Sequence, residues 1–251
     1  MPKINNLHSL VKQNKGKKSS KEGFKSGIYN YCDRWCERCP DTNKCYVYVK
    51  EQETKAMHLK RGEDPNDPSI VLKDVVEDMK DLHKMLDTKM KELGITDKDM
   101  EKMEKEIKPE PNFEAHILVK KAAKYFKQTH KFLNEFHYEQ QKMVVQFGVE
   151  IPDKDIDEEL KVISWYHSML SSKAFRLVSE VYHAKNEPNA EMKKMVKADL
   201  PKFFALVNKC ITKSQNALNS FLQKRKSYSK KIIPLLKLLN QIKTEVDKLK
   251  K

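Results

Sequence analysis

Apolar residues recur at intervals of three and four along most of the chain, which is the spacing of one face of an amphipathic helix. In the first half, this pattern predicts a helix over residues 47–60, a second from Pro68 to Gly94, and a short, highly charged one from Asp97 to about Ile107. A proline in the first turn and a glycine just past the end are common helix boundaries. The apolar stripe of the second helix consists of seven residues: Leu72, Val75, Met79, Leu82, Leu86, Met90 and Leu93.

The second half of the chain predicts four longer helices, over about 113–147, 157–184, 199–225 and 229–249. Asp199 is expected to cap the third of them, with Pro201 in its first turn. No useful stretch alternates between apolar and polar residues as a strand would. Four long amphipathic helices joined by modest loops predict an all-α fold whose main body is a four-helix bundle.

These elements divide the chain into four parts. Residues 1–26 are polar and rich in lysine, and we expect them to form a disordered arm. An irregular segment with four cysteines and the helix after it occupy 27–62, and a helical hairpin with a linker occupies 63–112. The bundle takes up 113–251, so the hairpin is an insertion between the cysteine module and the main body.

Positive charge is concentrated at the two ends of the chain. Of the 251 residues 34% are charged, and the net charge is +14. Residues 1–31 carry a net charge of +6 and residues 201–251 a net charge of +11. Such ends can attract nucleic acid. However, only five of the 50 basic residues are arginine, the residue best suited to reading phosphates and bases. Nucleic acid is therefore a partner that the composition allows but does not favour.

Membrane insertion and secretion are not indicated. No apolar run reaches the roughly 20 residues that a membrane-spanning helix needs. The N-terminal segment lacks the apolar middle of a secretory signal. We therefore expect a cytoplasmic protein, and because cytosolic thiols stay reduced, clustered cysteines favour metal binding over disulfides.

Four of the five cysteines, Cys32, Cys36, Cys39 and Cys45, fall within fourteen residues. Four thiolates can close a tetrahedral zinc site or bind the corners of an iron–sulfur cubane. Zinc modules usually take their ligands from two separate cysteine pairs. Ferredoxin-type clusters often take them from one loop, with a proline after a ligand as at Pro40. The spacing predicts a metal centre: a [4Fe–4S] cluster, with zinc as the alternative and redox thiols or disulfides as the remaining interpretations.

The first three cysteines also match the C-x3-C-x2-C motif of radical S-adenosylmethionine enzymes. In that family one iron of the cluster stays open for the cofactor, and the fold is a β/α barrel. Here Cys45 could fill the open position, Arg38 stands where the family usually has an aromatic residue, and no run of strands is predicted. A short motif outside its fold is a weak signal.

A second candidate site lies on the predicted bundle helices. His130 and His137 fall on the apolar stripe expected for the first of these helices, and His167 on that of the second. Glu180 and His183 form the i, i+3 pair that di-iron bundles use, although those proteins need the pair twice. Inward-facing histidines can bind metal or haem, or be core histidines with hydrogen-bonded partners, which is the commoner case.

The segment YCDRWCERCP, together with ISWYH at residues 163–167 and the leucine-rich C-terminal helix, resembles uncharacterised bacterial helical proteins with an N-terminal four-cysteine module. The resemblance covers the cysteine module and scattered points of the bundle. It implies no activity. Around the proposed metal centre, four aromatic residues are expected to pack: Tyr29, Tyr31, Trp35 and Tyr46.

The sequence shows no nucleophile with a base and an orienting group, no glycine-rich phosphate loop and no dinucleotide fingerprint. Cys210, the fifth cysteine, is expected to be a small buried apolar residue. Whether the protein is an enzyme therefore stays open. The leading hypothesis is an iron–sulfur redox or accessory protein that serves an unidentified protein partner. The alternatives are an oxidoreductase that uses the bundle metal site, and a nucleic-acid adaptor with a zinc module and basic ends.

Overall fold

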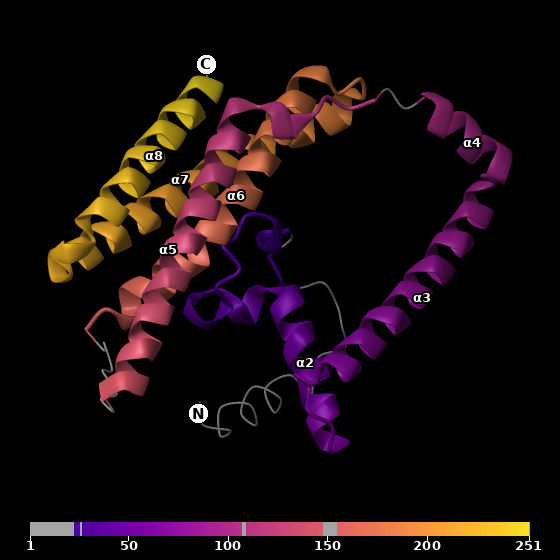
Figure 1. Cartoon of the computed structure of the whole chain (residues 1–251). Helices are drawn as coiled ribbons and strands as arrows, with labels where there is room; N and C mark the ends of the chain where they lie inside the picture. The colour runs from indigo at the N-terminus through magenta and orange to yellow at the C-terminus, as the bar shows by residue number, and fades with distance from the viewer. Residues whose placement is uncertain (1–22, 26, 107–108, 148–154, 251) are drawn as a thin grey trace. The chain divides into compact units, whose positions relative to one another are not determined.

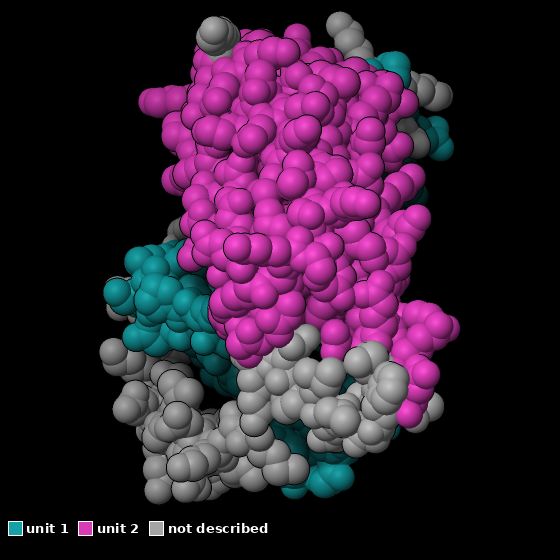
Figure 2. Space-filling model, turned by 60° about the vertical axis from the view of Figure 1, so that its left-hand side comes forward, with its two compact units in different colours: residues 1–30, 34–110 teal, residues 31–33, 111–251 magenta. Residues whose placement is uncertain are grey.

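The computed structural model describes residues 23–25, 27–106, 109–147 and 155–250. These residues form helices and turns without any strand, so the predicted all-α class is confirmed. They belong to two compact units (Figure 2). The N-terminal unit contains residues 1–30 and 34–110, and the C-terminal unit contains residues 31–33 and 111–251. Most of the predicted disordered arm, 1–26, lies outside the described residues.

Over its described residues, the N-terminal unit has three short 3-10 turns followed by three α-helices (Figure 1). The 3-10 turns bracket the cysteines, and the predicted helix boundaries agree with the observed ones to within about a residue. The elements are η1 (Ile28–Asn30), η2 (Cys36–Arg38), η3 (Thr42–Lys44), α2 (Tyr46–Lys60), α3 (Pro68–Leu93) and α4 (Asp97–Glu106).

Helix α3 has well-formed ends. The Asp67 side chain accepts a hydrogen bond from the Ser69 N–H at 2.8 Å, with Pro68 in the first turn. At the other end Gly94 takes a left-handed conformation with φ 67°, and the following N–H of Ile95 donates to the Met90 carbonyl at 2.9 Å. This is the Schellman arrangement, which satisfies carbonyls that a helix end otherwise leaves open.

The predicted helical hairpin does not form over the described residues. Helices α3 and α4 do not pack along one another, and eight apolar side chains of α3 stay exposed. The physical reason is the composition of α4, a ten-residue helix in which Met100 and Met103 are the only apolar residues. Such a helix has no apolar face wide enough to cover a 26-residue partner.

A buried histidine joins α2 to α3. His58 is 7% exposed, its Nδ1 lies 2.6 Å from a Glu63 carboxylate oxygen, and its Nε2 lies 2.9 Å from Asp74 Oδ2. The hydrogen bonds that Glu63 and Asp74 accept from His58 raise the pKa of His58, because both carboxylates favour the charged ring. The junction between the two helices is therefore a polar bridge that is strongest when His58 is protonated.

The C-terminal unit contains four long helices that lie alongside one another (Figure 1). Helix α6 packs against α5 and α7, and α8 packs against the same two helices. The elements are η4 (Phe113–Ala115), α5 (Ile117–Phe147), α6 (Asp157–Asn186), α7 (Ala190–Lys224), η5 (Lys226–Tyr228) and α8 (Ser229–Leu249). Among the described ranges, no helix combines the length and the apolar character needed to cross a membrane.

The third predicted bundle helix begins nine residues earlier than expected. Asn189 is its cap, because the Asn189 side chain accepts hydrogen bonds from the N–H groups of Glu191 and Met192, each at 3.0 Å. Pro201 therefore lies inside α7 rather than in its first turn. The prediction that Asp199 caps this helix is wrong, and Asp199 takes part in the contacts of Tyr31 described below.

The buried face of α5 also lies one residue away from the predicted apolar stripe, the one that contains His130 and His137. The buried residues are Leu118, Val119, Ala122, Tyr125, Thr129, Phe132, Leu133 and Phe136. Consequently His130 and His137 are exposed, whereas His167 of α6 is buried as predicted. Two apolar stripes, offset by one residue along α5, fit the sequence about equally well. The stripe with aromatic rings at positions 125, 132 and 136 is the buried one, because these large rings fill the interior.

Charge at the C-terminal end of the chain is partly neutralised within the C-terminal unit. Lys224 pairs with Glu159 at 2.6 Å, Lys231 with Glu135 at 2.9 Å, and Arg225 with Asp155 at 2.8 Å. Each pair joins a basic residue of segment 201–251 to an acidic residue that precedes that segment. The uneven charge along the sequence therefore becomes a set of contacts between neighbouring helices.

The His58 bridge predicts a pH dependence for the α2–α3 junction. Because the folded pKa of His58 is raised, its stabilising contribution is complete below the usual histidine pKa of about 6.5 and is lost as the pH rises through the raised value. Histidine NMR titration should show this raised pKa. It should move back toward the usual value in Asp74→Asn and stay raised in Asp78→Asn, a control on the same helix. A His58 pKa at or below the usual value would contradict the bridge.

Candidate metal centre

The cysteines lie at the edges of the short turns of the N-terminal segment. Cys36 begins η2, and the N–H of Cys39, just past its end, donates to the Cys36 carbonyl at 3.1 Å. Cys45 follows η3 and precedes α2, where its carbonyl accepts from Val49 N–H at 3.0 Å. Cys36 and Cys39 therefore share one turn, and Cys45 stands at the N-terminus of α2.

The segment that carries the cysteines has no hydrophobic core of its own. None of η1, η2 and η3 contains a buried residue, and all four cysteines are partly exposed. No disulfide joins any of the five cysteines. Small irregular segments need a staple in place of a core, either a metal or disulfides. The thiols are the groups in this segment that can supply one.

Local polar contacts shape the segment. The Arg38 guanidinium lies 3.7 Å from the centre of the Trp35 ring, a cation–π contact that spans η2. Lys25 donates to Asp41 at 2.7 Å and pairs its backbone N–H with the Lys44 carbonyl. Burial raises the pKa of Tyr48 on α2, and the charge of the neighbouring Cys36 thiolate raises it further. These contacts place Cys36 beside α2.

The chain makes a strained corner just before these turns. Arg34 has φ 57°, which makes it the one described residue other than glycine with a positive φ. This conformation costs a residue with a side chain about 1–2 kcal/mol. Such strain persists only where neighbouring contacts hold it. The residue before it, Asp33, makes the contacts described next.

Asp33 belongs to the C-terminal unit and is held there by three donors. Its Oδ2 accepts hydrogen bonds from the Tyr166 hydroxyl at 2.5 Å and from Lys209 Nζ at 2.7 Å. Its carbonyl accepts from Trp165 Nε1 at 2.8 Å. Asp33 is 8% exposed, and a carboxylate at such depth needs this many donors to offset its lost hydration. We call this set of contacts the Asp33 clamp.

Tyr31 adds a second attachment to the same unit. Its ring meets Phe203 of α7 edge to face at a centroid distance of 5.3 Å, and its hydroxyl donates to Asp199. Lys202 Nζ lies 4.5 Å from the centre of the Tyr31 ring and donates to Asp199 at 2.9 Å. Burial and the Asp199 carboxylate raise the pKa of Tyr31 to about 12. The residues on both sides of Cys32 are therefore fixed on α6 and α7.

This attachment corrects the aromatic shell predicted around the metal. Tyr31 packs on Phe203, and Tyr46 is 49% exposed with its ring against Phe24. The aspartate of the clamp and its two aromatic donors lie in the segments YCDRW and ISWYH of the sequence. No local pattern, however, indicates that an aspartate meets a tyrosine 133 residues away.

The described residues hold no preformed metal site. Among them, no group of three or more His, Cys, Asp or Glu side chains is arranged to hold a metal ion. Cys32 lies in the C-terminal unit with Tyr31 and Asp33, whereas Cys36, Cys39 and Cys45 lie in the N-terminal unit. No protein-family model, curated protein or solved structure matches the chain. The interpretation of this segment therefore rests on its own residues.

The second candidate site is distributed along two helices. His130, His167 and the Phe126 ring stack, with 5.9 Å between the two imidazole centres. His167 donates from Nδ1 to the Ser164 carbonyl at 2.6 Å, and burial lowers its pKa, so the ring is neutral near pH 7. His137 is exposed on α5 and does not join the stack.

The remaining members of that predicted site make other contacts. Glu180 accepts a hydrogen bond from Arg176 Nε at 3.1 Å, and His183 meets the rings of Phe113 and Tyr182 edge to face. The i, i+3 pair thus takes part in contacts of the helix surface. Cys210, by contrast, is fully buried as predicted, and burial raises its pKa to about 12.

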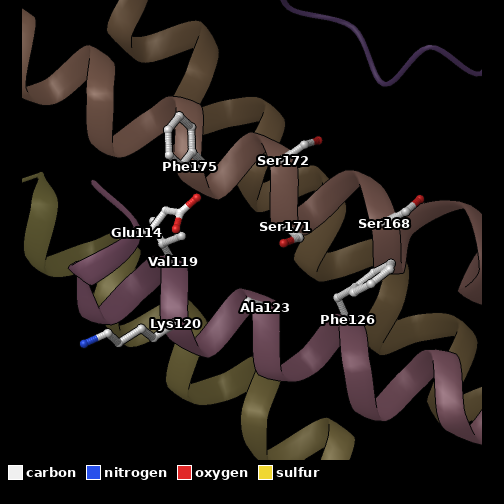
Figure 3. A pocket seen from close by; sticks show the side chains of 9 residues that line it. All are labelled: Glu114, Val119, Lys120, Ala123, Phe126, Ser168, Ser171, Ser172 and Phe175. Carbon is white, nitrogen blue, oxygen red and sulfur yellow. The ribbon is translucent and has the colours of Figure 1, made fainter. Parts of the chain in front are cut away.

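A shallow groove of about 570 Å³ runs between α5 and α6 (Figure 3). Small side chains leave this space, and two of its serines, Ser168 and Ser172, donate to carbonyls of their own helix. Its charged lining residues, Glu114 and Lys120, are both exposed. The lining residues are Glu114, Val119, Lys120, Ala123, Phe126, Ser168, Ser171, Ser172 and Phe175.

The Asp33 clamp predicts that replacing Asp33 destabilises the protein more than replacing Asp155. Asp33→Ala leaves the buried Tyr166 hydroxyl without its acceptor and should lower the free energy of unfolding by about 2–3 kcal/mol. It should also speed hydrogen exchange over residues 31–36. Asp155→Ala removes an aspartate that is also paired with a basic residue but is exposed, and should cost at most about 1 kcal/mol. Equal effects in urea unfolding would contradict the clamp.

Proposed function

We propose that this protein binds a metal through Cys32, Cys36, Cys39 and Cys45 and acts as an iron–sulfur redox or accessory protein. A [4Fe–4S] cluster is the proposed group, and zinc is the alternative. The observation that carries the proposal is the concentration of four cysteines in a segment without a core. In this proposal, α5–α8 form a four-helix bundle that carries one end of the segment through Tyr31 and Asp33.

The local structure supports thiolate ligation. Cys36 and Cys39 share one turn, and Cys45 directly precedes the first residue of α2. Partial exposure leaves the thiols accessible to an incoming metal. Cys210, buried and with its pKa raised, is excluded from the proposed ligands because burial disfavours its thiolate.

Because the described residues do not gather three ligands, metal binding would have to draw the turns together. Coupling of this kind is usual in small metal modules, where the free energy of binding also orders the fold. The segment suits it, since turns without a core can rearrange at little cost in packing. When bound, a cluster supplies one-electron transfer; the residues of this chain bind it, fix the position of Cys32 and order the segment for a partner.

Anaerobic purification followed by elemental analysis and visible spectroscopy tests the proposal. We expect a brown protein with about four irons per chain and an absorption near ~400 nm that fades on reduction. Cys36→Ser should lose most of the metal. Cys210→Ser is the matched control, because it removes a thiol outside the segment, and it should retain the metal.

The outcomes separate the hypotheses. A colourless chain with one zinc that Cys36→Ser removes would keep the four-cysteine site and reject electron transfer. Metal that survives Cys36→Ser would point to the bundle histidines instead. A chain that takes up neither iron with sulfide nor zinc after reconstitution would overturn the proposal.

A further inference from the structure

Helix α3 presents a long apolar face to solvent. Eight apolar residues on it are between 43% and 64% exposed. They are Val71, Leu72, Val75, Val76, Met79, Leu82, Met85 and Leu86. Single exposed apolar residues are common on protein surfaces, whereas a continuous stripe of them marks an interaction site.

The stripe follows a heptad repeat. With Leu72 as position a, Met79 and Leu86 are also a residues, and Val75 and Leu82 are d residues. The other three exposed residues fall on the flanking e and g positions, so the whole set lies on the face that a coiled coil buries. Lys89 occupies the next d position, and its Nζ forms an ion pair with Glu92 Oε2 at 2.5 Å. The apolar core of the repeat therefore spans residues 71–86.

The exposed area is a large part of what a dimer interface needs. With 43% to 64% of each of the eight residues exposed, the stripe leaves several hundred Å² in water, the order of the largest patch on a typical monomer. A standard interface buries about 800 Å² on each partner. One α3 helix therefore carries a large share of the surface for a specific contact with an equal helix.

The helix is also complementary to itself. In a parallel pair, each g position faces the following e position of the other helix. Val71 would then face Val76, Met85 would face Met90, and Asp78 would face His83. Two pairs are apolar and the third joins a carboxylate to an imidazole. In an antiparallel pair g faces g, so Asp78 would instead face a methionine or a second aspartate.

We propose that α3 is a homodimerisation helix that forms a parallel two-stranded coiled coil with α3 of a second copy of this chain. A second copy fits because the stripe matches itself in length and in heptad register, and because its one polar flanking pair joins a carboxylate to an imidazole that can hydrogen-bond to it. The inference is independent of metal binding, since none of the four cysteines lies on α3.

Sedimentation velocity on the full chain between about 1 and 100 μM tests the proposal. The wild type should sediment as a dimer. Leu82→Glu places two carboxylates at the centre of the seam and should raise the dissociation constant at least ~100-fold. Lys84→Glu introduces the same residue on the opposite face and should leave the dimer intact. Equal helicity of the two variants by circular dichroism excludes unfolding as the cause.

The orientation has its own test. His83→Glu should weaken a parallel dimer, because the introduced carboxylate would face Asp78 of the other helix, and Asp78→Lys added to it should restore the affinity. A monomeric wild type, a trimer or tetramer, or a dimer that survives Leu82→Glu would each overturn the proposal. Failure of Asp78→Lys to restore the affinity would overturn the parallel arrangement.

Discussion

The buried carboxylate of Asp33 is the interaction on which this account depends. A charged group with 8% exposure is stable only because Tyr166, Lys209 and Trp165 supply donors to it and to its backbone. Those donors come from α6 and α7, so two packed helices hold a short piece of the N-terminal segment. Arg34, with its positive φ, follows Asp33 in the chain, and the turn that holds Cys36 and Cys39 begins two residues later. The clamp thus provides a fixed starting point for a segment that lacks a core.

Pairing of basic residues with carboxylates on neighbouring elements also explains the uneven charge of the chain. Lysine and arginine residues of segment 201–251 reach acidic groups on the earlier helices of the C-terminal unit, and Lys209 reaches Asp33. The exposed pairs contribute little each, whereas the pairs with the buried carboxylates of Asp33 and Glu159 are costly to break. A strongly basic C-terminal end is therefore in part a requirement of packing, whichever partner the protein has.

Local sequence patterns predicted which segments are helical well. They predicted the buried faces and the contacts between distant segments less well. Asp67, Pro68 and Gly94 are strong local signals, and α3 begins and ends where they place it. The start of α7 was missed because Pro201 drew the boundary away from Asn189. The inner face of α5 was displaced by one residue because several phases fit the same repeat. The Asp33 clamp could not be predicted, since its partners are separated along the chain and only the packing of α6 on α7 brings them together.

The central claim is that the thiols of the N-terminal segment converge on one metal centre. X-ray absorption spectroscopy at the metal edge of the anaerobically purified chain tests it most directly, because it counts sulfur neighbours whether the metal is iron or zinc. The account predicts a first shell of sulfur at about 2.3 Å, with four cysteine sulfurs for a zinc ion or with additional bridging sulfide for a cluster. A first shell made mainly of nitrogen and oxygen would contradict it.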